Sequence, residues 1–160
     1  MATATPTRYE NLIKELKSEL GIRRIKYKEI IKLINREAYD EILVIVNVPV
    51  INNLIDEIVN EREMIGNDVA NTLNTLELLN DLLIIFNEEP QPSLTKARKL
   101  FKKNVFINIY DLAAKRYHGR YKTKQLLLSD LQNRRFPNLR FPLHVAKRHP
   151  VLKCFLWKIF

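Results

Sequence analysis

Apolar residues recur every three or four positions along most of the chain, which is the spacing of one buried face of an α-helix. The first such segment runs from Tyr9 to Leu20. Thr7 and Glu10 have the spacing of a capping box, in which each side chain satisfies a main-chain N–H of the other residue. Gly21 is a typical residue for the end of a helix. The pattern predicts a first helix between Thr7 and Gly21.

The same spacing predicts further helices along the chain. Gly66 and Asn67 are expected to break the helical pattern between two of them. Ser93 is expected to cap the first helix after the proline-containing segment 87–92, and Pro150 is expected to begin a terminal helix. The predicted helices cover residues 23–39, 52–65, 69–86, 93–118 and 123–132; Leu76, Leu79, Leu83 and Phe86 form a stripe that favours core packing over a coiled coil.

The apolar run from Ile42 to Ile51 is the one segment that also has the composition of a buried strand, because it is rich in β-branched residues. No other segment offers it a convincing partner strand, and a lone strand leaves its backbone groups unpaired. We therefore expect a buried helix that ends before Pro49. With only 3 glycines available for tight turns, the predicted fold class is all-α, a helical bundle followed by a basic helical C-terminal module.

Charge divides the chain more sharply than its net value of +9 suggests. Residues 1–90 hold 10 Lys/Arg against 16 Asp/Glu, whereas residues 91–160 hold 17 Lys/Arg against 2 Asp/Glu. We expect an acidic-to-mixed domain over 1–90 and a basic domain over 91–160, which includes the near-repeat of Arg-Phe-Pro in an extended path. Such asymmetry suggests an anionic partner or an acidic segment that masks a basic one.

The residues that could carry catalysis are few. His118, His144, His149 and the single Cys154 match no common metal-ligand, phosphate-loop or nucleophile motif. We therefore expect no enzyme activity, no metal site and no cofactor. A lone cysteine gives no sign of an oxidising compartment, and no secretory signal or membrane-spanning run is present, so a cytoplasmic or nuclear protein is expected.

The basic region interleaves cations with aromatic rings, above all in residues 115–124 and 134–141. Cations neutralise phosphates and release condensed counterions, while aromatic rings stack on unpaired bases. For a single ring, a place in the core is the favoured alternative. The candidate phosphate contacts are Lys115, Arg116, Arg120, Lys122, Lys124, Arg134, Arg135 and Arg140, and the candidate stacking rings are Tyr117, Tyr121 and Phe136.

An apolar helix followed by the turn Gly119-Arg120-Tyr121-Lys122 and further arginines resembles the small nucleic-acid-binding proteins of some filamentous plant RNA viruses. Those proteins carry a cysteine-rich finger after the arginines, where this chain has only Cys154. No residue role is transferred from them. The resemblance is in keeping with a viral accessory protein.

The leading functional expectation is a non-enzymatic accessory protein that binds nucleic acid, RNA rather than DNA, with low sequence specificity. The alternative is an interaction adaptor, in which the basic region docks on an acidic protein or on residues 41–90 of a second copy, giving a homo-oligomer. The apolar C-terminal segment 154–160 is expected to dock on the core first, on a partner second and on a membrane surface third.

Overall fold

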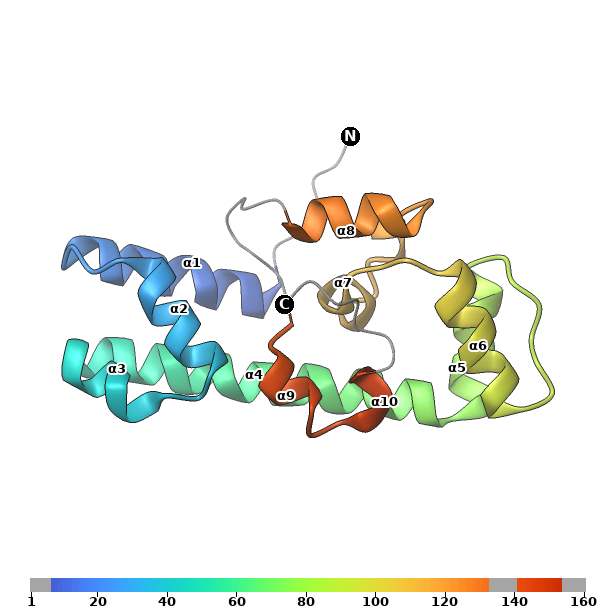
Figure 1. Ribbon diagram of the computed structural model, residues 1–160, viewed down its shortest axis with the longest axis horizontal. Helices are drawn as coiled ribbons and strands as arrows, with labels where there is room; N and C mark the ends of the chain where they lie inside the picture. The colour runs from blue at the N-terminus through green and yellow to red at the C-terminus, as the bar shows by residue number, and fades with distance from the viewer. Residues whose placement is uncertain (1–6, 133–140, 154–160) are drawn as a thin grey trace. The chain divides into compact units, whose positions relative to one another are not determined.

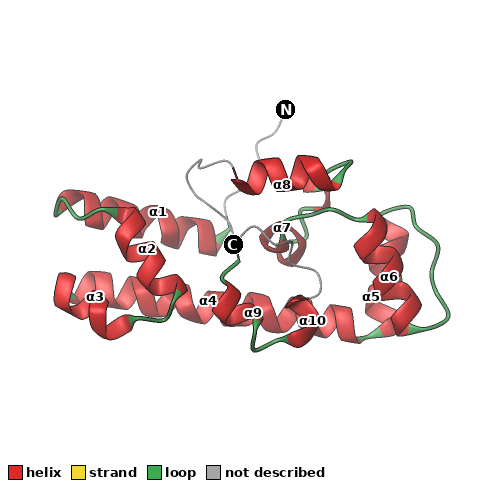
Figure 2. Ribbon diagram, in the orientation of Figure 1, coloured by secondary structure: helices red, strands yellow, loops and turns green. Residues whose placement is uncertain are grey.

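The computed structural model describes residues 7–132 and 141–153, and these residues are mainly helical with no strand among them (Figures 1 and 2). The predicted all-α class is confirmed. None of these helices is both long enough and apolar enough to span a bilayer. The helices are α1 (Arg8–Ile22), α2 (Tyr27–Asn35), α3 (Tyr39–Ile45), α4 (Pro49–Asn74), α5 (Leu76–Ile85), α6 (Leu94–Asn104), α7 (Ile109–Ala113), the 3-10 turn η1 (Tyr117–Gly119), α8 (Lys124–Gln132), α9 (Leu143–Ala146) and α10 (Pro150–Lys153).

The chain forms two compact units, an N-terminal unit of Met1–Met64 and a C-terminal unit of Ile65–Phe160. Their boundary falls inside α4, so this helix contributes residues to both. Helices α5 and α6 pack on each other within the C-terminal unit, across the proline-containing loop that connects them. The division into domains at residue 90 stays a prediction.

The N-terminal unit packs α1 on α2 and α2 on α3. Thr7 caps α1 as predicted, because its side chain accepts a hydrogen bond from the Glu10 N–H at 3.2 Å. Among the residues of this unit that the structure describes, Arg62 of α4 is the one buried charged residue, with 3% of its surface exposed. Its Nε donates a hydrogen bond of 2.9 Å to the hydroxyl of Tyr9. Apolar side chains that are almost fully buried fill the rest of this unit: Ile13, Leu16, Leu20, Ile30, Ile34, Ile51 and Ile58.

The continuous helix predicted over residues 23–39 is wrong. Arg24 and Glu37 adopt φ values of 57° and 58°, a left-handed conformation that does not continue a right-handed helix. Helix α2 therefore lies between these two residues, and α3 begins only at Tyr39.

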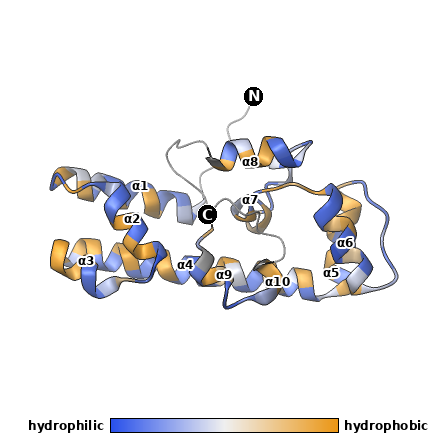
Figure 3. Ribbon diagram, viewed as in Figure 1, coloured by the Kyte–Doolittle hydropathy of each residue, from blue (hydrophilic) through white to orange (hydrophobic). Residues whose placement is uncertain are grey.

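Segment 41–51 is helical in its first part, so the preference for helix over strand is confirmed. Its expected burial holds for Ile42, Val46 and Ile51 but is wrong for residues 43–45 and Val50. Helix α3 ends at Ile45, and α4 begins at Pro49, whose ring suits the first position of a helix. Ile42 is buried, whereas Val44 is 88% exposed and Leu43 is 46% exposed. Helix α3 therefore presents apolar side chains to solvent, and its ribbon carries both hydrophilic and hydrophobic colours in Figure 3.

The predicted break at Gly66 is also wrong, because α4 runs through it to Asn74. A Cβ atom at Gly66 would lie 3.2 Å from Cδ2 of His149 and 3.5 Å from Cζ of Phe141. The glycine therefore allows the segments around residues 141–149 to pack closely against α4. The helix ends instead before Thr75, whose extended backbone separates α4 from α5. In α5, Leu79 and Leu83 are fully buried and support the core-packing interpretation of the leucine stripe.

Beyond the loop, Ser93 caps α6 as predicted, with its hydroxyl accepting from the Lys96 N–H at 3.3 Å. The prediction that this helix reaches His118 is wrong, because α6 ends at Asn104. Phe106 then pairs with Tyr121 in an isolated antiparallel bridge, in which the Tyr121 N–H donates to the Phe106 carbonyl at 2.7 Å. The predicted helix after Thr123 is confirmed as α8, and α10 begins at Pro150 as expected.

Candidate nucleic-acid interface

In the C-terminal unit, most of the described arginines are less exposed to solvent than the described lysines. Arg98, Arg116 and Arg120 are half-buried, whereas Arg148 is exposed. The lysines whose side chains the structure describes in this unit are all exposed: Lys96, Lys99, Lys102, Lys103, Lys115, Lys122, Lys124 and Lys147. The described arginines among the predicted phosphate contacts and the lysines predicted with them therefore have different surroundings.

Arg120 holds together the ends of two helices. Its Nη1 donates to the carbonyl of Phe86, the C-cap residue of α5, and its Nη2 donates to the carbonyl of Asn104, the last residue of α6, each at 2.7 Å. Glu88 lies 3.6 Å away as an ion-pair partner. The last carbonyls of a helix lack intrahelical partners and carry partial negative charge, so a guanidinium stabilises them. The guanidinium of Arg120 is therefore engaged in contacts within its own chain.

Two further predicted site residues also bind within the chain. The guanidinium of Arg116 lies 3.9 Å from the carboxylate of Asp111, and 17% of the Arg116 side chain is exposed. The hydroxyl of Tyr121 donates a hydrogen bond to Asp130. Burial and this hydrogen bond raise the pKa of Tyr121 above its ordinary value. These contacts assign both residues to the internal structure of the unit.

Other predicted site residues face solvent or lie outside the described part of the chain. Lys115, Lys122 and Lys124 are exposed. The ring of Tyr117 packs edge-on against Phe86, with centroids 5.4 Å apart and an interplanar angle of 83°. The predicted contacts that lie outside the described residues are Arg134, Arg135, Phe136 and Arg140.

Helix α6 carries a cationic surface that sequence reasoning did not assign to the site. Its buried positions are Ala97 and Phe101, and on a helix of 3.6 residues per turn the opposite face holds Lys96, Lys99 and Lys103. These three lysines define the α6 lysine face. Helix α6 contains no acidic residue, and within the described residues none of the three ammonium groups has an ion-pair partner.

The signal for the α6 lysine face was present in the sequence, in the combination of the helical period with the apolar pattern around Ala97 and Phe101. Recognising this face from the sequence would have required knowing where α6 ends and which cations form hydrogen bonds within the chain. Arg98, which lies between Lys96 and Lys99 in α6, donates through Nε to the Leu73 carbonyl at 2.7 Å and through Nη2 to the Asn74 side chain. It caps the end of α4, as Arg120 caps α5 and α6.

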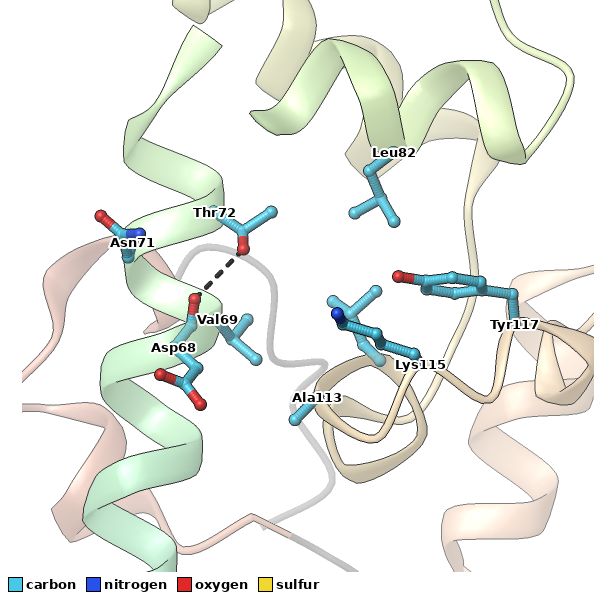
Figure 4. Close-up of a pocket in the computed structure, with 9 residues that line it drawn as sticks. Asp68, Val69, Asn71, Thr72, Leu82, Ala113, Lys115 and Tyr117 are labelled. Atoms are coloured by element: carbon cyan, nitrogen blue, oxygen red, sulfur yellow. Dashed lines mark hydrogen bonds between the residues drawn. The ribbon is translucent and has the colours of Figure 1, made fainter. Parts of the chain in front are cut away.

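An open pocket of about 310 Å³ lies between α4 and the turn after α7 (Figure 4). Asp68 and Thr72 lie on its α4 side. Lys115 and Tyr117 lie opposite, with the ammonium and the hydroxyl pointing toward the α4 side (Figure 4). The pocket thus brings together two of the predicted site residues.

Within the described residues, no group of three or more His, Cys, Asp or Glu side chains is placed to hold a metal ion. No family model matches this chain, and comparisons with curated proteins and with solved structures found no match. The functional interpretation therefore depends on the charges and contacts described above.

Proposed function

We propose that this protein is a non-enzymatic accessory protein that binds nucleic acid, RNA in preference to DNA, with low sequence specificity. The observation that supports it is the α6 lysine face, a row of exposed ammonium groups on a helix without an acidic residue. In this proposal the C-terminal unit is the basic module that meets the polyanion.

The geometry of the α6 lysine face suits a linear polyanion. Lys96 and Lys103 are separated by about 10 Å along the helix axis, from a rise of about 1.5 Å per residue. Consecutive phosphates of one strand can therefore meet more than one lysine. Binding releases condensed counterions and depends little on base sequence. The exposed Lys115 and Lys122 extend the positive charge of the same unit.

The experiment is a salt series of binding to single- and double-stranded RNA, with fluorescence anisotropy as the readout. The test variant is Lys96→Gln/Lys99→Gln/Lys103→Gln. On single-stranded RNA each phosphate contact accounts for a slope of about 0.7 in log K against log salt, so the triple variant should lose about 2 of that slope. Its affinity at low salt should fall accordingly.

The matched control removes the same charge from the N-terminal unit. Lys14, Lys28 and Lys32 are exposed there, and the variant that replaces all three by glutamine should keep the slope nearly unchanged. Circular dichroism checks that both variants keep their helices. Absence of RNA binding by the unaltered protein at low salt would overturn the proposal, as would an equal loss of slope in the control.

A second candidate function, interaction with another protein or with a second copy, is supported by the exposed apolar residues of α3. Val44 is 88% exposed and Ile45 is 46% exposed, and exposed apolar patches of this kind are typical of interaction sites. Light scattering at low and high salt tests it. Association that persists at high salt and is abolished by Val44→Glu supports this candidate; a monomer at every salt concentration counts against self-association.

A further inference from the structure

The pocket between α4 and the turn after α7 has two donors on one side. Lys115 adopts φ 58° two residues after the end of α7, and its ammonium and the hydroxyl of Tyr117 both point toward the α4 side of the pocket (Figure 4). Within the described residues, neither the ammonium nor the hydroxyl has a hydrogen-bond or ion-pair partner. Two unused donors that line one pocket, one of them cationic, suit a phosphate group.

The Tyr117 ring is held in place rather than mobile on the surface. Its edge-on contact with Phe86 connects it to the same residue whose carbonyl accepts from Arg120. The backbone N–H of Arg120 also donates to the Tyr117 carbonyl at 3.2 Å. The Tyr117 hydroxyl is therefore positioned in advance of any ligand, which lowers the entropic cost of binding.

The other side of the pocket offers an apolar surface and an acceptor. Val69 and Leu82 are 4% and 5% exposed and give the pocket an apolar lining. Asp68 is exposed on the α4 side. The Thr72 hydroxyl donates to the Asp68 main-chain carbonyl at 3.1 Å and not to the carboxylate, and within the described residues this carboxylate has no ion-pair partner. A carboxylate accepts from the exocyclic amino group of a base such as cytosine and repels the carbonyl oxygens of uracil.

We propose that this pocket binds one unpaired nucleotide whose base carries an exocyclic amino group, with its phosphate at Lys115 and Tyr117 and its amino group at Asp68. The pocket volume of about 310 Å³ lies at the lower end of the range for ligand sites, which suits a single nucleotide. This inference rests on the proposed function when the nucleotide belongs to RNA. A base in a duplex cannot enter, so the pocket gives a preference for single strands.

The first test uses the full chain and free nucleotides, so that it does not depend on polymer binding. Cytidine and uridine monophosphate are titrated while the backbone amide signals of Val69, Thr72 and Ala113 are followed by NMR. Cytidine monophosphate should shift these signals and bind about tenfold more tightly than uridine monophosphate, as expected for one well-placed hydrogen bond. Asp68→Asn should abolish this discrimination, and Asp56→Asn, at an exposed acid of the N-terminal unit, should leave it intact.

The second test uses short oligocytidine and oligouridine. Lys115→Gln should weaken both about fivefold to tenfold through the lost phosphate contact, whereas Lys122→Gln should have a smaller effect. Equal affinity for both oligonucleotides together with no amide shifts from either mononucleotide would overturn the pocket proposal. In that case salt-dependent RNA binding that requires the α6 lysine face would still support the proposed function. Mononucleotide binding without RNA binding would overturn the proposed function and support the pocket as a site for free nucleotides.

Discussion

Arg120 contacts Phe86 in two ways, through a hydrogen bond of 2.7 Å to its carbonyl and through a cation–π approach of 5.2 Å to its ring centroid. The same guanidinium reaches the Asn104 carbonyl. The Arg120 side chain thus joins the end of α5 to the end of α6. From the sequence alone, Arg120 belongs to the basic segment 115–124 and is expected at the surface.

Replacing Arg120 should lower the free energy of unfolding, because its guanidinium bonds the carbonyls at two helix ends. Arg120→Ala leaves two helix-end carbonyls without their charged donor, and we expect the free energy of unfolding to fall by about 3 kcal/mol. Arg120→Lys keeps the charge but not the planar fork, so a loss of about half that size is expected. Urea denaturation measures both. Lys122→Ala, at an exposed neighbour, should change stability by less than about 0.5 kcal/mol; an equally small effect of Arg120→Ala would contradict the capping role.

Two glycines in helices should respond to substitution in opposite directions. A Cβ added at Gly21 would have no neighbouring atom within 4 Å outside its own helix, so Gly21→Ala should stabilise the protein by about 0.5 to 1 kcal/mol through helix propensity. Gly66→Leu would force its side chain into His149 and Phe141 and should destabilise by about 2 kcal/mol or more. Thermal unfolding monitored by circular dichroism separates the two. A stabilising Gly66→Leu would show that the close contact at α4 does not persist in solution.

The buried pair Arg62 and Tyr9 should be coupled in the N-terminal unit. Tyr9→Phe removes the hydroxyl that accepts from the Arg62 Nε at 2.9 Å, and the expected loss is about 1 to 3 kcal/mol. A double-mutant cycle with Arg62→Met isolates the pairwise contribution. A coupling energy of about 1 kcal/mol or more is expected from denaturant unfolding, and strictly additive effects would show that the hydrogen bond contributes little.

Alkaline pH should destabilise the fold through Tyr27. Burial, together with the neighbouring Tyr9, raises the pKa of Tyr27 above its ordinary value of 10.0, while Arg62 opposes the shift. The folded state therefore holds this proton more tightly than the unfolded chain does. Its contribution to stability is complete below pH 10.0 and is lost as the pH rises above that value.

Unfolding experiments at neutral pH and above the ordinary tyrosine pKa measure this effect. Tyr27→Phe cannot ionise, so its stability should fall less steeply with rising pH than that of the unaltered protein. Tyr121→Phe is the companion variant in the C-terminal unit, where burial and the bond to Asp130 also raise the pKa of a tyrosine. Parallel pH profiles for Tyr27→Phe and the unaltered protein would contradict the prediction.

Features with local causes could be predicted from the sequence. The caps at Thr7 and Ser93 depend on residues three positions apart, and the ring of Pro150 suits a helix start without help from distant segments. Gly66 shows the limit. Its intrinsic preference indicates a helix break, but the contact with His149 that uses the missing side chain comes from far along the chain.

The positive charge of the candidate site could be predicted from the sequence, but which cations are exposed and which bond within the chain could not. Sequence reasoning treats Arg120 and Lys115 alike, since both belong to one basic cluster. Which of them meets a carbonyl depends on where α5 and α6 end, and α6 ends at Asn104 rather than at His118. Val44 was misjudged for a related reason, because periodicity shows that a residue is apolar but not that another segment covers it.

In the C-terminal unit, three described arginines are half-buried while the described lysines are exposed, and this difference has a chemical consequence. Acylating reagents react with primary amines and leave guanidinium groups intact, so they can neutralise the outer charge of the C-terminal unit without touching the contacts of Arg98 and Arg120. An enzyme that acetylates lysine would achieve the same. If the proposed function holds, modification of the lysines grades the affinity for polyanions while the contacts that support the fold stay constant.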